Sequence, residues 1–276
     1  MMCAWKELLS ILPPWLRREV DMLGKQTLGE LRLRINSPPE LVLGKGSRWL
    51  AKPVTREDIS FCVNAASSYS PWAAATSAKG YLTIQGGHRI GLCGEAVCKN
   101  GEITGFREIH SLCIRVARDY SGIAQGLGSD GNTLILGAPG WGKTTLLRDL
   151  IRNIAQEDTT AVIDERGELF PAGFQRGKRM DVLTGCPKAQ GISMALRTMG
   201  PAWIAVDEIT AQEDCDAMLK AIGCGVRLAA TAHASSLEEF LSRPAYSRLW
   251  DMRIFQRIVI LNANRAYRAE RVGEWK

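Results

Sequence analysis

The second half of the chain alternates short apolar runs with longer amphipathic segments. Each run has four or five β-compatible residues, and helix-type or polar segments separate the runs. Residues 144–155 instead repeat leucine and isoleucine at helical spacing. Buried strands that alternate with helices are typical of a mostly parallel sheet covered on both faces. The predicted strands are 133–136, 160–164, 203–207, 227–231 and 257–261.

The first part of the chain predicts a smaller α/β module. Apolar residues between positions 8 and 12 indicate one face of a short helix, and a second helix is predicted over 56–67. Residues 31–35 alternate apolar side chains with arginine, which is typical of a half-buried strand. Glycines punctuate the remaining β-type runs. These runs are 81–84, 88–92, 95–98 and 113–116.

The boundary between the two parts is predicted in residues 119–132. This stretch holds four glycines and few bulky side chains, so it is the best candidate for a linker. The expected organisation is an N-terminal α/β domain over residues 1–125 and a larger domain over residues 126–276. With 276 residues, the chain is long enough to bury a sizeable core.

Composition is that of an ordinary soluble globular protein, with 46% hydrophobic and 23% charged residues. Lys6, Glu7 and the prolines at 13 and 14 interrupt any signal-peptide core, and no apolar run approaches the ~20 residues that cross a bilayer. The eight cysteines form no C-x-x-C pair, which favours reduced structural thiols over disulfides or a zinc site. We therefore expect a cytoplasmic protein. The net charge of +6 is spread along the chain and does not discriminate between partners.

Residues 137–144 read Gly-Ala-Pro-Gly-Trp-Gly-Lys-Thr and fit the pattern G-x-x-x-x-G-K-[ST]. In such a loop the backbone N–H groups surround phosphates, the lysine adds a charge near the outer phosphates, and the last hydroxyl ligates magnesium. A predicted strand precedes the loop and a predicted helix follows it, so the helix dipole also points at the phosphates. The sequence therefore predicts ATP and Mg²⁺ as ligands, with Thr144 at the metal. The expected nucleotide-binding residues are Gly137, Ala138, Pro139, Gly140, Trp141, Gly142, Lys143, Thr144 and Thr145.

Acidic residues follow two of the predicted strands. Strand 203–207 ends in Asp207 and Glu208, in the form of a Walker B element. Asp207 is expected to hold magnesium through water, and Glu208 to orient or deprotonate the attacking water. After strand 160–164, Glu165 or Glu168 could serve as the base in place of Glu208. The carboxyl ends of parallel strands share one edge of a sheet, so we expect these groups beside the phosphate loop.

His233 closes the strand predicted at 227–231. Its imidazole could sense the γ-phosphate or bond the catalytic glutamate. A single histidine at a strand end is otherwise more often a structural hydrogen-bonding group, and the neighbouring motifs favour the functional interpretation here.

Five stretches together resemble the stage III sporulation protein AA family, whose members are similar to the ATPases of type II and type IV secretion systems. They are the phosphate loop 137–144, the acidic box 162–169, the segment 181–189, the Walker B segment 206–209 and the histidine box 231–234. Segments 80–91 and 106–118 resemble the same family, so the likeness covers most of the chain. This combination is much more specific than a phosphate loop alone.

The resemblance implies an α/β fold with a RecA-like P-loop NTPase domain behind a smaller N-terminal α/β domain. It implies a ring, expected to be a hexamer, with ATP clamped between the domains. By analogy with secretion ATPases, Arg89 and Arg115 are expected to reach the γ-phosphate from the N-terminal domain. The implied setting is the mother-cell cytoplasm of a spore-forming bacterium, with peripheral attachment to membrane-embedded channel proteins of a sporulation secretion complex.

Two positions depart from the broader secretion-ATPase pattern. Asp207 precedes Glu208 where those enzymes usually have glycine, and Ser235 stands where their histidine box has asparagine. Both departures bear on which residue is the base more than on whether ATP binds.

Two other functions fit the same core. A nucleic-acid translocase is motivated by the positive net charge, but the sequence has no evident loop that combines aromatic and basic residues for base stacking, so nucleic acid is not an expected partner. A nucleotide-gated scaffold would bind ATP with little turnover and have assembly as its output.

Overall fold

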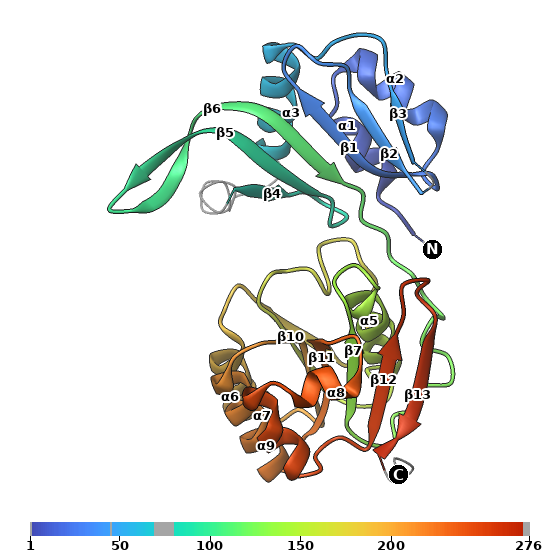
Figure 1. Cartoon of the computed structure of the whole chain (residues 1–276), viewed down its shortest axis with the longest axis vertical. Helices are drawn as coiled ribbons and strands as arrows, with labels where there is room; N and C mark the ends of the chain where they lie inside the picture. The colour runs from blue at the N-terminus through green and yellow to red at the C-terminus, as the bar shows by residue number, and fades with distance from the viewer. Residues whose placement is uncertain (1, 45, 69–79, 273–276) are drawn as a thin grey trace. The chain divides into compact units, whose positions relative to one another are not determined.

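A computed structural model describes residues 2–44, 46–68 and 80–272 of the chain. The chain divides into two compact units. Unit 1 holds the chain up to Asp119 together with Pro171–Phe174, and unit 2 holds Tyr120–Phe170 and the chain from Gln175 onward. Figure 1 shows both units.

Unit 1 contains a six-stranded sheet in the order β3-β2-β1-β6-β5-β4, and all neighbouring strands are antiparallel. Strands β5 and β6 extend beyond the others as a two-stranded ribbon (Figure 1). The strands are β1 (Leu28–Arg34), β2 (Glu40–Leu43), β3 (Gly46–Trp49), β4 (Tyr81–Thr83), β5 (Arg89–Lys99) and β6 (Glu102–Arg115). The helices are α1 (Trp5–Ser10), α2 (Pro14–Leu23) and α3 (Arg56–Ser68).

The core of unit 1 lies between the helices and one face of its sheet. In β1, Leu31 and Leu33 are fully buried while Arg32 and Arg34 lie on the other face, as the alternating pattern predicts. Leu8, Ile11 and Leu12 are fully buried in the same core. The half-buried strand is therefore confirmed. The short helix is confirmed only as far as Ser10, because Ile11 and Leu12 follow the end of α1 and reach the core from the turn.

The prediction of separate strands at 88–92 and 95–98 was wrong, because both runs belong to the single strand β5. The glycine between them, Gly94, is not a break. A Cβ at this position would collide with the backbone carbonyl of Glu108 on β6, so glycine allows the strands to approach closely at a bulge. The strand predicted at 113–116 is likewise only the end of the much longer β6.

Unit 2 contains a seven-stranded sheet in the order β13-β12-β7-β11-β10-β8-β9. Every neighbouring pair is parallel except β12 and β13. The predicted mostly parallel sheet is thus confirmed. The strands are β7 (Thr133–Gly137), β8 (Thr160–Asp164), β9 (Met180–Thr184), β10 (Trp203–Ile209), β11 (Arg227–His233), β12 (Arg257–Leu261) and β13 (Tyr267–Arg271). The helices are α5 (Lys143–Ile154), α6 (Lys188–Thr198), α7 (Gln212–Gly223), α8 (Leu237–Leu241) and α9 (Pro244–Asp251).

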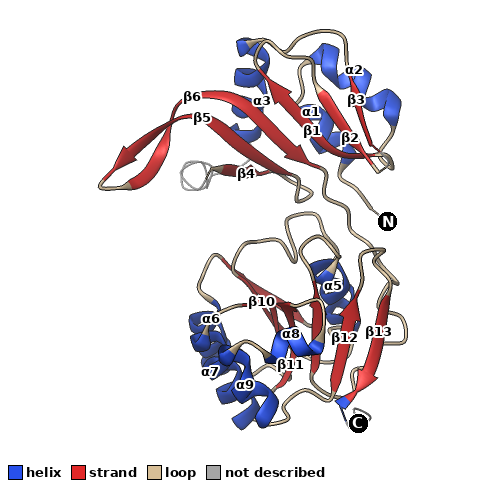
Figure 2. Cartoon of the chain, in the orientation of Figure 1, coloured by secondary structure: helices blue, strands red, loops and turns tan. Residues whose placement is uncertain are grey.

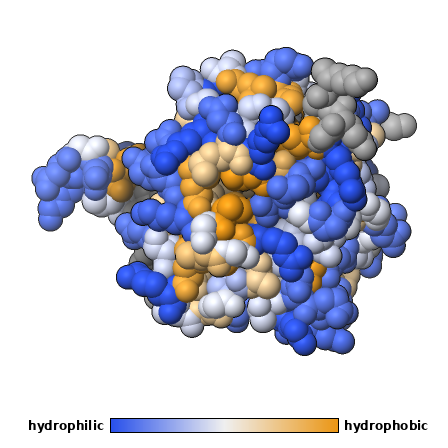
Figure 3. Space-filling view, turned by 90° about the horizontal axis from the view of Figure 1, so that it is seen from below, coloured by the Kyte–Doolittle hydropathy of each residue, from blue (hydrophilic) through white to orange (hydrophobic). Residues whose placement is uncertain are grey.

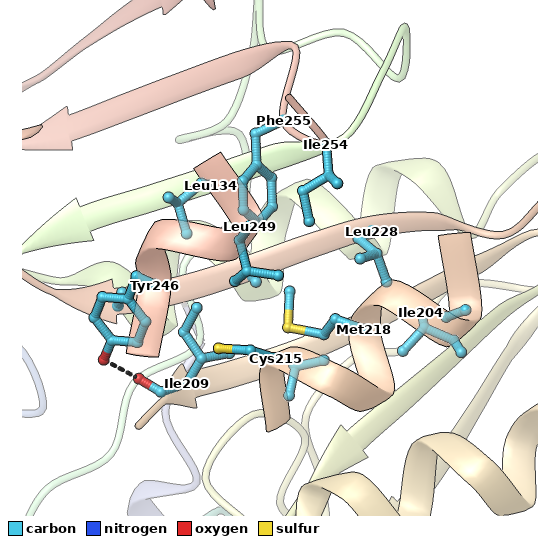
Figure 4. Packing of buried hydrophobic residues seen from close by; sticks show 14 of the residues in the cluster. Leu134, Ile204, Ile209, Cys215, Met218, Leu228, Tyr246, Leu249, Ile254 and Phe255 are labelled. Atoms are coloured by element: carbon cyan, nitrogen blue, oxygen red, sulfur yellow. Dashed lines mark hydrogen bonds between the residues drawn. The ribbon is translucent and has the colours of Figure 1, made fainter. Parts of the chain in front are cut away.

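Helices cover both faces of this sheet, so its central strands are buried on both sides (Figure 2). On one face α5 packs against Ile135 and Val162. On the other face α6, α7 and α9 pack against Leu134, Ile204 and Leu228, as Figure 4 shows in part. Strands buried on both faces form continuous apolar runs, which explains why these strands could be recognised from sequence.

The stretch after Asp119 is not the free linker that its glycines predicted. Ala124 and Leu127 are buried in the α5 side of the core of unit 2. The Ala124 N–H also donates to the buried carboxylate of Asp149 on α5 at 2.8 Å. This segment therefore belongs with unit 2 from Tyr120 onward, ahead of the boundary expected at residue 125.

On the face that Figure 3 displays, most residues are hydrophilic and apolar residues gather in a band. Within the ranges that the structure describes, each helix is too short or too polar to span a bilayer.

A pH effect on stability is expected from His88, which is fully buried. Its Nδ1 accepts from the Ala117 N–H at 3.1 Å and its Nε2 donates to the Ala4 carbonyl at 2.8 Å, so the ring is held neutral. Burial lowers the pKa of His88 below its ordinary value of 6.5. The unfolded chain therefore takes up the proton first, so stability that is present above pH 6.5 is lost as pH falls from that value through the lower pKa of the folded state.

We expect His88→Gln to flatten the pH dependence of the unfolding free energy just below pH 6.5, measured by urea denaturation at a series of pH values. His110→Gln is the matched control, because that side chain is 54% exposed. If His88→Gln kept the wild-type slope of unfolding free energy against pH, His88 would not be the source of this pH dependence.

A second prediction concerns Tyr246, which is buried in the core shown in Figure 4. Its hydroxyl donates to the Ile209 carbonyl at 2.8 Å. Tyr246→Phe should lower the free energy of unfolding by about 1 to 2 kcal/mol, because it removes a buried hydrogen bond. Tyr267→Phe is the control, since its hydroxyl contact with Gln125 is exposed and long, at 3.4 Å. Equal denaturation midpoints for the two variants would refute this expectation.

Candidate active site

The loop between β7 and α5 has the backbone that a phosphate-binding turn requires. Gly140 and Gly142 have φ of +78° and +100°, in the left-handed region that favours glycine. No atom lies within 4 Å of a Cβ built at either position, so the conformation, and not crowding, explains the choice of glycine. Gly142 is the N-cap of α5, and the helix begins at Lys143. The backbone N–H groups of this turn thus lie at a helix N-terminus.

Lys143 is buried, with 6% of its surface exposed. Its Nζ donates to the Ala138 carbonyl at 3.1 Å and to Nδ1 of His233 at 2.9 Å. Burial lowers the pKa of Lys143, and the carboxylates of Asp207 and Glu208 partly oppose this shift. The lysine therefore places a cation at the strand ends, close to the acidic residues of β10.

Asp207 lies between two threonine hydroxyls. Its Oδ2 accepts from Thr144 at the start of α5 at 2.7 Å, and its Oδ1 accepts from Thr231 on β11 at 2.6 Å. The hydroxyl and the carboxylate expected at a magnesium ion are thus in direct contact. Hard oxygen donors of this kind are the ligands that Mg²⁺ prefers, so the residues fit the expected metal.

Glu208 is held by two side chains and has an unusual backbone conformation. Its carboxylate accepts from His233 Nε2 at 2.9 Å and from Arg166 Nη1 at 2.7 Å. Because the ammonium of Lys143 can only donate, Nδ1 of His233 accepts and Nε2 carries the proton. Of the two roles predicted for His233, the geometry favours bonding to this glutamate. The φ of Glu208 is +55°, a left-handed value that is uncommon outside glycine.

The other acidic residues surround a cleft shared with Asp207 and Glu208. Asp164 at the end of β8 is buried, and its carboxylate accepts the backbone N–H groups of residues 168, 169 and 170. Burial raises the pKa of Asp164, while these hydrogen bonds oppose the shift. Asp164 thus orders the loop that carries Glu165 and Glu168.

The three candidate bases have different partners. Glu165 pairs with the buried ammonium of Lys188 on α6, and Glu168 lines the cleft. Glu208 is bonded to His233, which in turn contacts the lysine of the phosphate loop. This connection favours Glu208 as the residue that acts on water.

Arg89 and Arg115 lie in unit 1 as a register pair on β5 and β6. The Arg89 guanidinium lies over the Tyr81 ring, 3.9 Å from its centroid, and Arg115 Nε is 3.8 Å from a carboxylate oxygen of Glu30. The structure thus brings the two arginines together on one sheet. Their role toward a nucleotide stays a prediction.

Ser235, one of the two positions expected to depart from the secretion-ATPase pattern, bonds to a residue of the next helix. Its hydroxyl donates to the carboxylate of Glu239 on α8 at 2.6 Å. Ser235 therefore contributes a hydrogen bond at the start of α8.

Sequence reasoning missed several residues of this site. Thr231 carries a detectable signal, because it precedes His233 by two positions in a strand and so lies on the same face. Arg166 and Lys188 gave no comparable signal. Their partners Glu208 and Glu165 lie far from them in the chain, and only the packing of the loops brings these side chains together.

The fold is similar to those of two solved proteins, an ATPase and a pilus retraction motor. The Legionella pneumophila ATPase DotB superposes with a TM-score of 0.60 at 17% identity, over 94% of this chain and 80% of that one. The pilus retraction motor PilT, solved with bound ADP, superposes with a TM-score of 0.64 at 17% identity, over 94% of this chain and 78% of that one. At this level of identity the likeness shows the fold alone, which is the RecA-like P-loop fold of these ATPases.

Sequence comparison identifies the family as well as the fold. The family described as "Sporulation stage III, protein AA" matches residues 5–271. The Stage III sporulation protein AA of Bacillus subtilis (strain 168) is 39% identical over 279 aligned positions, which cover 93% of this chain and 90% of that protein. Because both matches span nearly the whole chain, this protein belongs to the sporulation stage III protein AA family.

Proposed function

We propose that this protein is a magnesium-dependent ATPase that works as a ring-forming motor of sporulation. The observation that carries the proposal is the continuous set of contacts from Lys143 through His233 to Glu208, next to the bonded pair Thr144 and Asp207. A phosphate-binding lysine, a pair of metal-binding oxygens and a histidine-bonded carboxylate are the parts that P-loop hydrolysis requires.

Each part has a role set by its position. The backbone N–H groups from Gly137 to Thr145 bind the phosphates, and Lys143 supplies positive charge to the outer ones. Thr144 and Asp207 hold Mg²⁺, which neutralises charge on the phosphate oxygens when it is bound. Glu208 orients the attacking water and accepts its proton. His233 keeps the Glu208 carboxylate in place through its Nε2 proton.

The wider setting follows from family membership. We propose that the chain acts in the mother-cell cytoplasm of a spore-forming bacterium and is attached to membrane-embedded channel proteins. In the ring, which we expect to be a hexamer, Arg89 and Arg115 would approach the γ-phosphate and stabilise the developing charge. Hydrolysis would then move one domain relative to the other and transmit force to the channel.

Phosphate release by the assembled protein tests the reaction. Lys143→Ala and Glu208→Gln should each lower kcat at least ~10²-fold, because one removes the phosphate-binding charge and the other the base. Glu208→Gln should still bind ATP, as measured by calorimetry. Glu165→Gln and Glu168→Gln are matched controls, each replacing another carboxylate of the same cleft by its isosteric amide.

Equal rates in the wild-type protein, Lys143→Ala and Glu208→Gln would contradict an ATPase. A larger loss in Glu165→Gln or Glu168→Gln than in Glu208→Gln would move the base to that residue. Tight ATP binding by the assembled wild-type protein without turnover would instead favour the nucleotide-gated scaffold.

Native mass spectrometry tests ring formation. The 30.3 kDa chain should shift to a multiple of its mass, expected to be sixfold, when a non-hydrolysable ATP analogue is added with Mg²⁺. The reason is that nucleotide bound between domains stabilises the closed assembly. Lys143→Ala should not respond to the analogue. A monomer at saturating analogue concentration would argue against the ring.

A further inference from the structure

Thr231 lies fully buried on β11, two residues before His233, at the strand-end edge of the sheet in unit 2. We propose that Thr231 is a positioning residue that joins the metal-binding carboxylate of Asp207 to the water-activating residue Glu208. The inference rests on the proposed ATPase function and assigns this residue a part in it.

The hydroxyl of Thr231 makes one hydrogen bond in each direction. It donates to Asp207 Oδ1 at 2.6 Å and accepts from the backbone N–H of Glu208 at 2.7 Å. A hydroxyl has one proton and two acceptor lone pairs, so both contacts form at the same time. A single buried oxygen atom therefore fixes two consecutive residues of the Walker B strand.

The bond to Asp207 sets the orientation of its carboxylate. Oδ2 is bonded to Thr144 and Oδ1 to Thr231, so the carboxylate cannot rotate without breaking one of two short bonds to hydroxyl groups. Bonds from a hydroxyl to an ionised carboxylate are stronger than neutral ones. Thr231 thus holds Asp207 turned toward the start of α5, where the magnesium ligand Thr144 lies.

The bond to Glu208 holds a strained backbone. At +55°, the φ of Glu208 differs from that of an extended strand residue, and the pairing of β10 with β11 is irregular between Val206 and Ile209. Glu208 therefore departs from the regular ladder, and its N–H bonds to the side chain of Thr231. A left-handed non-glycine residue is strained and persists only where its surroundings hold it. Without the hydroxyl, Glu208 should relax and move its carboxylate away from His233.

The test is Thr231→Val, which keeps the shape of the side chain and removes the hydroxyl. Its kcat for ATP should fall ~10²-fold, because small displacements of catalytic groups have effects of this size. The Mg²⁺ concentration for half-maximal nucleotide binding should rise, since Asp207 is free to rotate. The KM for ATP at saturating Mg²⁺ should stay near the wild-type value, because the phosphate loop is unchanged. Thr231→Ser keeps the hydroxyl and should restore all three quantities.

Thr160→Val is the matched control for losing a buried threonine hydroxyl from the same sheet. Thr160 is 1% exposed on β8, and its hydroxyl donates to the Asp158 carbonyl, outside the site. If Thr231 only contributed stability, the two valine variants would lose thermal stability alike and keep their kcat. That result would overturn the inference.

Hydrogen–deuterium exchange of the nucleotide-free protein gives a readout that does not depend on activity. The Glu208 amide should lose protection in Thr231→Val and keep it in Thr231→Ser and Thr160→Val. Unchanged protection in Thr231→Val would overturn the inference, as would lost protection with wild-type kcat and Mg²⁺ dependence. Absence of turnover in the assembled wild-type protein would overturn the ATPase proposal and, with it, a role of Thr231 in catalysis, whatever the exchange result.

Discussion

The geometry of the site depends on the carboxylate of Asp207 and its two hydroxyl partners. Thr144 opens α5 and Thr231 lies on β11, so these contacts connect three segments that are far apart in the chain. They meet because β7, β11 and β10 are neighbouring parallel strands whose carboxyl ends share one edge. A shift of one residue in the pairing of any of these strands would turn its side chains to the opposite face. The register of the sheet therefore decides the chemistry.

The lysine of the phosphate loop is a cation buried away from water. Lys143 is buried, and its immediate partners are a carbonyl oxygen and an imidazole nitrogen, both uncharged. Taking a cation out of water is unfavourable unless other charges compensate, which is why burial lowers the pKa of this lysine despite the nearby carboxylates. A polyphosphate would supply the missing negative charge directly. The same feature that destabilises the isolated site therefore favours the proposed ligand.

The helix that begins at the phosphate loop is also fixed by buried charges. Arg148 of α5 donates to the Glu168 carbonyl, which lies in the loop ordered by Asp164. Arg152, one turn further, bonds to Asp149 and to the Tyr120 carbonyl, where the chain enters unit 2. One helix thus supports the phosphate loop, the acidic loop and the entry segment together. Hydrogen bonds of charged side chains to backbone carbonyls are among the stronger kinds, so each of these contacts contributes more than a neutral bond would.

The phosphate loop, the Walker B pair and the parallel sheet could all be recognised in the amino-acid sequence. A phosphate turn requires small residues in one contiguous stretch, and strands buried on both faces require continuous apolar runs. The folded structure was needed to see that Gly94 continues a strand, that Arg166 pairs with Glu208, and that Thr231 bonds to both residues of the Walker B pair. Local patterns report backbone preference and burial, which nearby residues set. Partners from distant segments depend on how strands pair and loops pack, and that is a property of the whole fold.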